Sequence, residues 1–262
     1  MKAAAAAESI ALAGGVFAVA PGLAWLPRTR TLVVADAHLG YEEVVGGALP
    51  LWSTAESAVT LRLVAQRTGA REIAFVGDVV HGSAMSEGAA RTIAALLATL
   101  REIAEVTLIA GNHEGRSRAA AVLGATVESA ERDGWLLAHG DRALPPGRRA
   151  IVGHLHPSLR IGAALTAPAF LACESLIVVP ALTPYSPGLD VLSQDCANAL
   201  RAWGVRRREA QIVVAAGDRL YPFGSLAALA TLLGTGAAQR GGAAQGRRVP
   251  GRRRRLESDR RE

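Results

Sequence analysis

Six histidines occur in this chain of 262 residues, and all of them lie in short polar motifs that follow apolar, strand-like runs. There are five such motifs: Asp36-Ala37-His38, Gly77-Asp78-Val79-Val80-His81, Gly111-Asn112-His113-Glu114, His139-Gly140-Asp141 and Gly153-His154-Leu155-His156. In α/β sheets, ligands bind outside the carboxyl ends of the strands. Five consecutive strand ends that bear Asp, Asn or His therefore predict one polar site at a single edge of a layered sheet.

The stretches between these motifs alternate between strand and helix patterns. Apolar runs predict strands over residues 31–35, 72–76, 106–110, 135–138 and 150–152. Helices are predicted from a capping box at Ser53-Thr54-Ala55-Glu56 to Gly69, from Ser86 to Arg101, and from Arg116 to Leu123. This alternation predicts an α/β architecture with a layered sheet core.

Shorter β-like runs, separated by Pro and Gly, follow the last motif. They cover residues 158–161, 169–172, 176–179, 191–192 and 212–215, and a final helix begins near Ser225. Of the 29 basic and 23 acidic residues, nine Arg and three acidic residues lie from Gly234 onward, which leaves a neutral body with 20 of each. We expect a single domain over residues 1–233 and a disordered, Arg-rich tail over residues 234–262.

The first 20 residues superficially resemble a secretory signal, but Glu8-Ser9 and Gly14-Gly15 interrupt the apolar run. The alternative is a hairpin with strands over residues 16–19 and 22–25. No segment has the ~18 uninterrupted apolar residues of a membrane span. Cys173 and Cys196 are too few for a disulfide framework. The hairpin and two unpaired thiols together predict a cytoplasmic protein with no membrane contact.

The residue types in the motifs are those that hold a pair of divalent metal ions. Imidazole, carboxylate and amide donors suit Mn²⁺, Fe or Zn²⁺, and the absence of Cys from the motifs disfavours a closed structural zinc site. Two such ions, about 4 Å apart, lower the pKa of a shared water and clamp phosphoryl oxygens. Each motif alone is common in turns and strand ends. The ordered set of five predicts phosphoryl-transfer chemistry.

The series D-x-H, G-D-x-x-H, G-N-H-E, H and G-H-x-H resembles the calcineurin-like metallophosphoesterases. This resemblance implies a four-layer αββα sandwich with two divalent metal ions, Mn²⁺ being the first choice and Fe or Zn²⁺ the alternatives. It implies one metal held by Asp36, His38, Asp78 and His156, and a second held by Asp78, Asn112, His139 and His154. Asp78 would then bridge the two ions.

The third motif supplies two further candidates. His113 resembles the family's general acid, the group that donates to the transition state. Glu114 has two open roles: it orients His113 as a hydrogen-bond partner, or it caps the following helix.

The second motif departs from the Ser/Thr protein phosphatases, which carry Asp-Arg-Gly where this chain has Val80-His81-Gly82-Ser83. The phosphate-clamping Arg of that branch is missing, which weakens a phosphomonoesterase assignment. His81 instead resembles the SbcD-type DNA-repair nucleases, where this His helps to handle the scissile phosphate. The alternative for His81 is a structural hydrogen bond below the site.

Residues 16–233 as a whole resemble the small SbcD-related proteins, which include the ligase-associated (PdeM-like) phosphoesterases. The matching segments are Ala35–Tyr41, Leu49-Pro50, Val152–Pro157, Val179–Leu182 and Gly217–Leu220. The resemblance implies a phosphoesterase domain that lacks the DNA-capping and ATPase-docking segments of a full SbcD nuclease.

We therefore expect a binuclear-metal-dependent phosphodiesterase in which a metal-bridging hydroxide attacks a phosphate diester, with nucleic acid as one candidate substrate. A phosphomonoesterase would use the same metals, and a non-catalytic scaffold would normally have lost ligands that are all present here. The Arg-rich tail offers phosphate contacts to nucleic acid, or is simply a solvated chain end. The sequence does not fix the oligomeric state.

Overall fold

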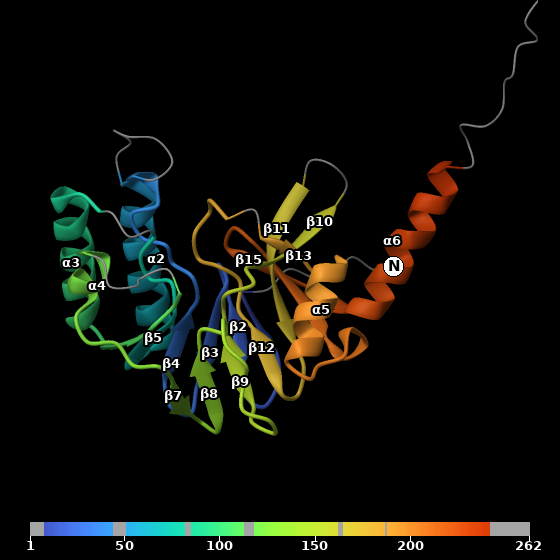
Figure 1. The fold of residues 1–262 in the computed structure, drawn as a ribbon, viewed down its shortest axis with the longest axis horizontal. Helices are drawn as coiled ribbons and strands as arrows, with labels where there is room; N and C mark the ends of the chain where they lie inside the picture. The colour runs from blue at the N-terminus through green and yellow to red at the C-terminus, as the bar shows by residue number, and fades with distance from the viewer. Residues whose placement is uncertain are drawn as a thin grey trace, which may run out of the picture.

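The computed structural model describes residues 8–43, 51–81, 85–112, 118–161, 165–186 and 188–241, and it contains two sheets (Figure 1). The first sheet has six strands in chain order: β1 (Ser9–Ala11), β2 (Phe17–Val19), β3 (Leu23–Leu26), β4 (Thr31–Val34), β5 (Glu72–Val76) and β6 (Glu105–Ile109). The pairs up to β3–β4 are antiparallel, whereas β4, β5 and β6 are parallel. The hairpin of β2 and β3 confirms the prediction for residues 16–25.

The second sheet is built from nine strands. Its main path runs through β13 (Leu189–Asp190), β10 (Pro157–Ile161), β11 (Leu165–Ala172), β12 (Leu176–Val178), β9 (Ala150–Val152), β8 (Trp135–Ala138) and β7 (Ala130–Arg132). From β11 the sheet also continues through β14 (Gln211–Ala216) to β15 (Arg219–Ser225). Strands β8, β9 and β12 are parallel to one another, so this sheet also has a set of carboxyl ends at one edge.

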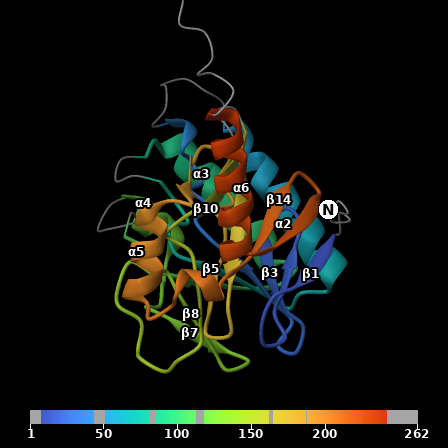
Figure 2. The same cartoon turned by 90° about the vertical axis from the view of Figure 1, so that its right-hand side faces the viewer.

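Helices cover the outer face of each sheet. On one side lie α2 (Trp52–Thr68), α3 (Glu87–Arg101) and α4 (Arg118–Leu123), and on the other lie α5 (Gln194–Ala202) and α6 (Leu226–Gly241), with a short 3-10 helix, η1 (Arg207–Glu209), between them (Figure 1). Seen from that second side, α5 and α6 lie in front of the strands (Figure 2). The four-layer αββα sandwich of a single domain is therefore confirmed.

Three apolar cores match these four layers. In β4 and at the residue after it, Leu32 and Val34 face the core beneath α2 and α3, whereas Val33 and Ala35 face the core between the sheets. This alternation follows from the two-residue period of a strand. Because β4 is buried on both faces, its sequence is a continuous apolar run. The third core packs the second sheet against α5 and α6.

A buried carboxylate ties the two sheets together at the end away from the motifs. Glu72 of β5 accepts two hydrogen bonds from Arg132 of β7, at 2.7 and 2.6 Å, and one each from Thr31 and Thr107. Burial acts to raise the pKa of Glu72, but these hydrogen bonds and the Arg132 charge outweigh it, so the pKa is lowered. Both sheets are thus fixed to one ionised group.

Most predicted elements are present within a residue or two of their expected bounds, and α2 ends at Gly69 in the left-handed conformation, as predicted. Three details were wrong. No side chain caps α2 at its start, because Glu42 binds the Ser53 and Thr54 N–H groups instead. The strand expected at residues 191–192 is Leu189–Asp190, where the pairing with β10 lies. Strands β1, β7 and β15 and helix α5 were not predicted.

Residues 44–50, 82–84, 113–117, 162–164, 187 and 242–262 lie outside the described residues, so the predictions for His113, Glu114 and Leu49-Pro50 fall outside them too. The predicted boundary after residue 233 stays a prediction, and α6 runs to Gly241. Among the described helices, none is both long and apolar enough to span a membrane. Cys173 and Cys196 are both free thiols.

Candidate metal centre

The motif residues converge because every one of their loops leaves a parallel strand at its carboxyl end. Asp36 follows β4, Asp78 follows β5 and Asn112 follows β6 in the first sheet, while His139 follows β8 and His154 follows β9 in the second. The two sheets pack face to face, so these two rows of strand ends meet along one edge of the sandwich. The site therefore combines residues from both sheets.

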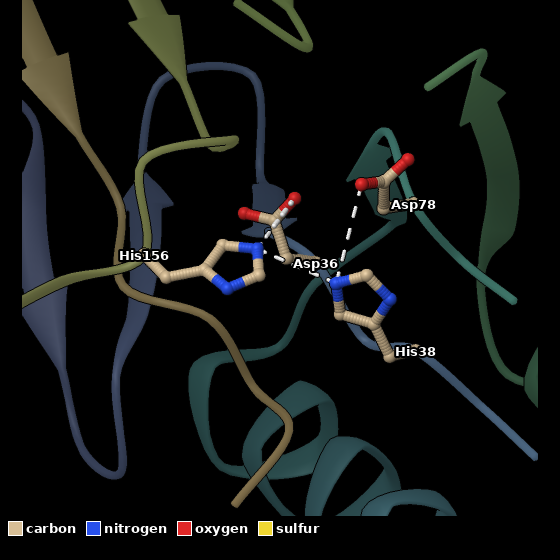
Figure 3. Close-up of side chains that lie close together, drawn as sticks. All are labelled: Asp36, His38, Asp78 and His156. Carbon is tan, nitrogen blue, oxygen red and sulfur yellow. Dashed lines mark hydrogen bonds and ion pairs between the residues drawn. The ribbon is translucent and has the colours of Figure 1, made fainter. Parts of the chain in front are cut away.

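Asp36, His38, Asp78 and His156 form a compact group (Figure 3). Each offers one ligand atom, and these four atoms all lie within 4.8 Å of one another. His156 Nε2 is 3.5 Å from Asp36 Oδ1 and 3.4 Å from His38 Nε2, and His38 Nε2 is 4.0 Å from Asp78 Oδ2. Asp36, His38 and Asp78 are buried, and His156 is half-buried. This is an arrangement of donors that a divalent cation fits.

Asp36 carries the most direct sign that a cation belongs there. Its Oδ2 accepts a hydrogen bond from the His154 N–H at 2.8 Å, but its Oδ1 is buried without a hydrogen-bond partner among the described residues. A buried carboxylate oxygen that accepts no hydrogen bond is costly, and such oxygens normally accept hydrogen bonds or coordinate a metal. The donor set of two carboxylates and two imidazoles therefore fits the predicted ion.

A second group shares Asp78 with the first. His139 Nε2 lies 2.8 Å from Asn112 Oδ1, 3.1 Å from His154 Nδ1 and 3.5 Å from Asp78 Oδ2. Burial lowers the pKa of His154, and the neighbouring His139 lowers it further. A lowered pKa keeps the ring neutral, which is the form in which imidazole binds a metal.

The backbone at the site adopts a left-handed conformation that is uncommon for residues other than glycine. Seven non-Gly residues of the described chain have a positive φ, and five of them are predicted ligands: Asp36, His38, Asp78, His154 and His156. This conformation costs L-residues roughly 1–2 kcal/mol each, so it persists only where the surroundings impose it. Such strain is concentrated at functional sites.

Residues 29–157, which contain all seven predicted ligands, match the calcineurin-like phosphoesterase family. The chain belongs to this family. Its membership makes it a metal-dependent phosphoesterase, a hydrolase of phosphoric esters. No curated protein matches the chain.

Two solved structures are similar to this phosphoesterase. The nuclease MPE of Pseudomonas putida is 20% identical with a TM-score of 0.64, over 82% of this chain and 98% of that one. YfcE, a phosphoesterase from E. coli, is 14% identical with a TM-score of 0.37, over 72% of this chain and 92% of that one. The likeness to MPE shows a shared fold.

Three motif glycines of the phosphoesterase make room for the ligands. A Cβ at Gly77 would lie 2.1 Å from His139 Nδ1, one at Gly111 would lie 2.2 Å from Asp78 Oδ1, and one at Gly153 would lie 2.4 Å from Asp36 Oδ2. Real Cβ atoms are not found this close to other heavy atoms. Each glycine is thus required by the side chain that packs against its α-carbon.

Other residues hold the predicted ligands in place, and sequence reasoning missed two of them. Ser186 Oγ lies 2.5 Å from His156 Nδ1, which leaves Nε2 directed at Asp36. Glu42 anchors the loop of the first motif to α2, because Thr54 Oγ1 accepts from the Gly40 N–H and donates to Glu42. The Pro and Gly residues that separate the short β-like runs after the last motif were the sequence signal near Ser186.

His81 also contacts this group. Its Nδ1 lies 2.9 Å from His38 Nδ1, and its ring meets Tyr41 edge to face at a centroid distance of 4.3 Å. One of the two Nδ1 atoms must donate, which fixes the orientation of both rings. The contact is consistent with the structural alternative for His81, and it also keeps the ring beside the predicted metal ligands.

Proposed function

We propose that this chain is a phosphodiesterase with a binuclear divalent-metal centre, Mn²⁺ being the first candidate. Asp36, His38, Asp78 and His156 would hold one ion, and Asp78, Asn112, His139 and His154 the other. One observation carries the proposal: Asp78 Oδ2 faces both groups, at 4.0 Å from His38 Nε2 and 3.5 Å from His139 Nε2. A shared carboxylate is what a two-metal site needs.

Two divalent ions, when bound, supply an activated water and positive charge for the phosphoryl oxygens. Hydrolysis forms a bond from the water oxygen to phosphorus and breaks the bond to the leaving alcohol, whose oxygen takes up a proton. We assign that proton donation to His113. His81, held against His38, would contact the scissile phosphate or orient His38. Glu114 would orient His113 or cap the following helix.

The preference for a diester has two supports. The second motif carries His81 in the segment where the protein phosphatases have their phosphate-clamping Arg. The solved relative MPE is described as a nuclease, which is an enzyme that cleaves phosphodiesters. We place the chain with the small SbcD-related phosphoesterases and, given its two free thiols, in the cytoplasm.

The test compares bis-p-nitrophenyl phosphate with p-nitrophenyl phosphate, with added Mn²⁺ and with chelator. We expect chelator-sensitive cleavage that favours the diester. Asp78→Asn should abolish it, while Asp195→Asn, which changes an exposed acidic residue of α5 outside every motif, should not. Preference for the monoester would make the chain a phosphomonoesterase, and full activity of Asp78→Asn would contradict the shared-carboxylate centre.

Measuring His81→Gln separates its two roles. Loss of metal affinity together with activity would indicate that His81 orients His38. Loss of turnover with metal content intact would indicate contact with the phosphate.

A further inference from the structure

A groove of about 320 Å³ opens beside the candidate metal centre, and the chemistry of the two metal groups does not account for it. His156, one of the predicted metal ligands, is among its lining residues. It is also lined by Ser158 and Arg160 of β10, Thr166 of β11, and Tyr185 and Ser186 of the following loop region. The groove and the candidate metal centre thus share His156, and strands β10 and β11 of the second sheet supply part of its lining.

The β10–β11 hairpin extends at the upper edge of the molecule in Figure 1. Residues of both its strands line this groove and form one of its walls. Ser158 and Arg160 are two residues apart on β10, so their side chains point to the same face of the sheet. Thr166 is the cross-strand partner of Arg160. The wall is thus a regular strand surface, which places Arg160 rigidly with respect to His156.

Arg160 is the cation of this groove. It is exposed, and among the residues that the structure describes it has no ion-pair partner. His156 lies four positions earlier, just before β10 begins, so at a strand rise of 3.3 Å the two α-carbons are at most ~13 Å apart. A guanidinium there is placed to contact a second anionic group of a substrate, in addition to the phosphate at the metal centre.

An aromatic surface lies at the groove's rim. Tyr185 is 40% exposed and stacks on Tyr41, with ring centroids 5.2 Å apart and an interplanar angle of 18°. Tyr41 in turn contacts His81 edge to face, so the rings connect the groove to the candidate centre. Exposed aromatic rings beside a cation are how proteins bind single-stranded nucleic acid without sequence preference.

We propose that this groove is a subsite for a second phosphate of the substrate, with Arg160 as its anion contact, and that the substrate is single-stranded nucleic acid. The inference rests on the proposed phosphodiesterase function and extends it. A small diester has one phosphate and therefore no second anionic group that could contact Arg160. A single strand of nucleic acid would place a further phosphate and a base along the groove.

The test uses the full-length protein with Arg160→Gln, Arg160→Lys and, as a matched control, Arg208→Gln, which removes another exposed arginine in η1. Binding of a fluorescent single-stranded oligonucleotide is measured by anisotropy in chelator over a range of salt concentrations. Arg160→Gln should weaken binding about tenfold and reduce the slope of log K against log salt by about 0.7, the contribution of one phosphate contact on a single strand. Arg160→Lys should keep most of that slope.

With Mn²⁺ present, Arg160→Gln should raise the KM for the oligonucleotide about tenfold at unchanged kcat, and leave bis-p-nitrophenyl phosphate unaffected. Wild-type affinity and slope in Arg160→Gln, or an equal loss in Arg208→Gln, would overturn the subsite. Failure of the wild-type protein to cleave bis-p-nitrophenyl phosphate would instead contradict the proposed function. The oligonucleotide binding measured by anisotropy would still test whether Arg160 forms an anion subsite.

Discussion

Gly111→Ala adds one methyl group at the most crowded point of the candidate centre. The new Cβ would lie 2.2 Å from Asp78 Oδ1 and 2.3 Å from the Asp78 backbone nitrogen. Ordinary contact begins at 3.4 Å, so the shortfall to Oδ1 is 3.4 minus 2.2, or 1.2 Å. The backbone nitrogen cannot move independently, and therefore the whole Asp78 turn has to shift. The φ of Gly111 is not left-handed, so the effect is purely steric.

A shift of that size exceeds what the proposed site tolerates. Metal–ligand distances vary by only about 0.2 Å, and a misplacement of about 1 Å in a catalytic site costs about a hundredfold in rate. We expect kcat/KM for bis-p-nitrophenyl phosphate to fall by about a hundredfold or more, which corresponds to about 2.7 kcal/mol in the barrier. Overpacking should also lower the free energy of unfolding by about 1–3 kcal/mol.

The assay combines turnover at saturating Mn²⁺, metal content by mass spectrometry and a thermal melt, so that loss of fold and loss of geometry are separated. Gly88→Ala in α3 is the matched control. Its Cβ would approach nothing closer than 3.7 Å, and it should leave activity unchanged and stabilise the helix by about 0.5–1 kcal/mol. A folded Gly111→Ala protein with wild-type turnover and metal content would refute the argument that Asp78 must stay where it is.

Three further outcomes follow from the same structure. Ser186→Ala should weaken Mn²⁺ binding about tenfold in calorimetry, because the His156 ring loses its orienting partner, and Ser186→Thr should restore it. Burial raises the pKa of Cys196 to about 11, so in native protein at about pH 8 a thiol reagent should label the half-buried Cys173 and not Cys196. Glu72→Gln should lower the free energy of unfolding at neutral pH by about 2 kcal/mol, since the half-buried Arg132 loses its two hydrogen bonds to a carboxylate. Because the folded pKa of Glu72 lies below its ordinary value of 4.5, that deficit should shrink in urea titrations as the pH falls below 4.5.

The sequence predicted the layered sheets and the convergence of the motifs because both depend on local patterns. A strand buried on both faces appears as an apolar run, and a loop at its carboxyl end appears as the polar residues that follow. Those two rules alone bring Asp36, Asp78 and His139 to one edge.

What the sequence did not predict depends on pairing between distant segments. The capping box at the start of α2 reads as a local signal, yet Glu42, eleven residues before Ser53, binds those N–H groups in its place. Ser186 contacts His156 from thirty residues away. The parallel pairing of β12 with β9, which places the loop of Ser186 near the site, likewise joins separate parts of the chain.

The candidate centre is also where this chain departs most from the local rules that stabilise a fold. Five of its seven predicted ligands adopt left-handed backbone conformations, a buried oxygen of Asp36 has no hydrogen-bond partner among the described residues, and glycines stand where any side chain would collide with a ligand. Each departure costs stability, so the apolar cores on both faces of the sheets must enforce them together. A cation bound by Asp36 would compensate one of these costs directly, and this links metal binding to the stability of the whole sandwich.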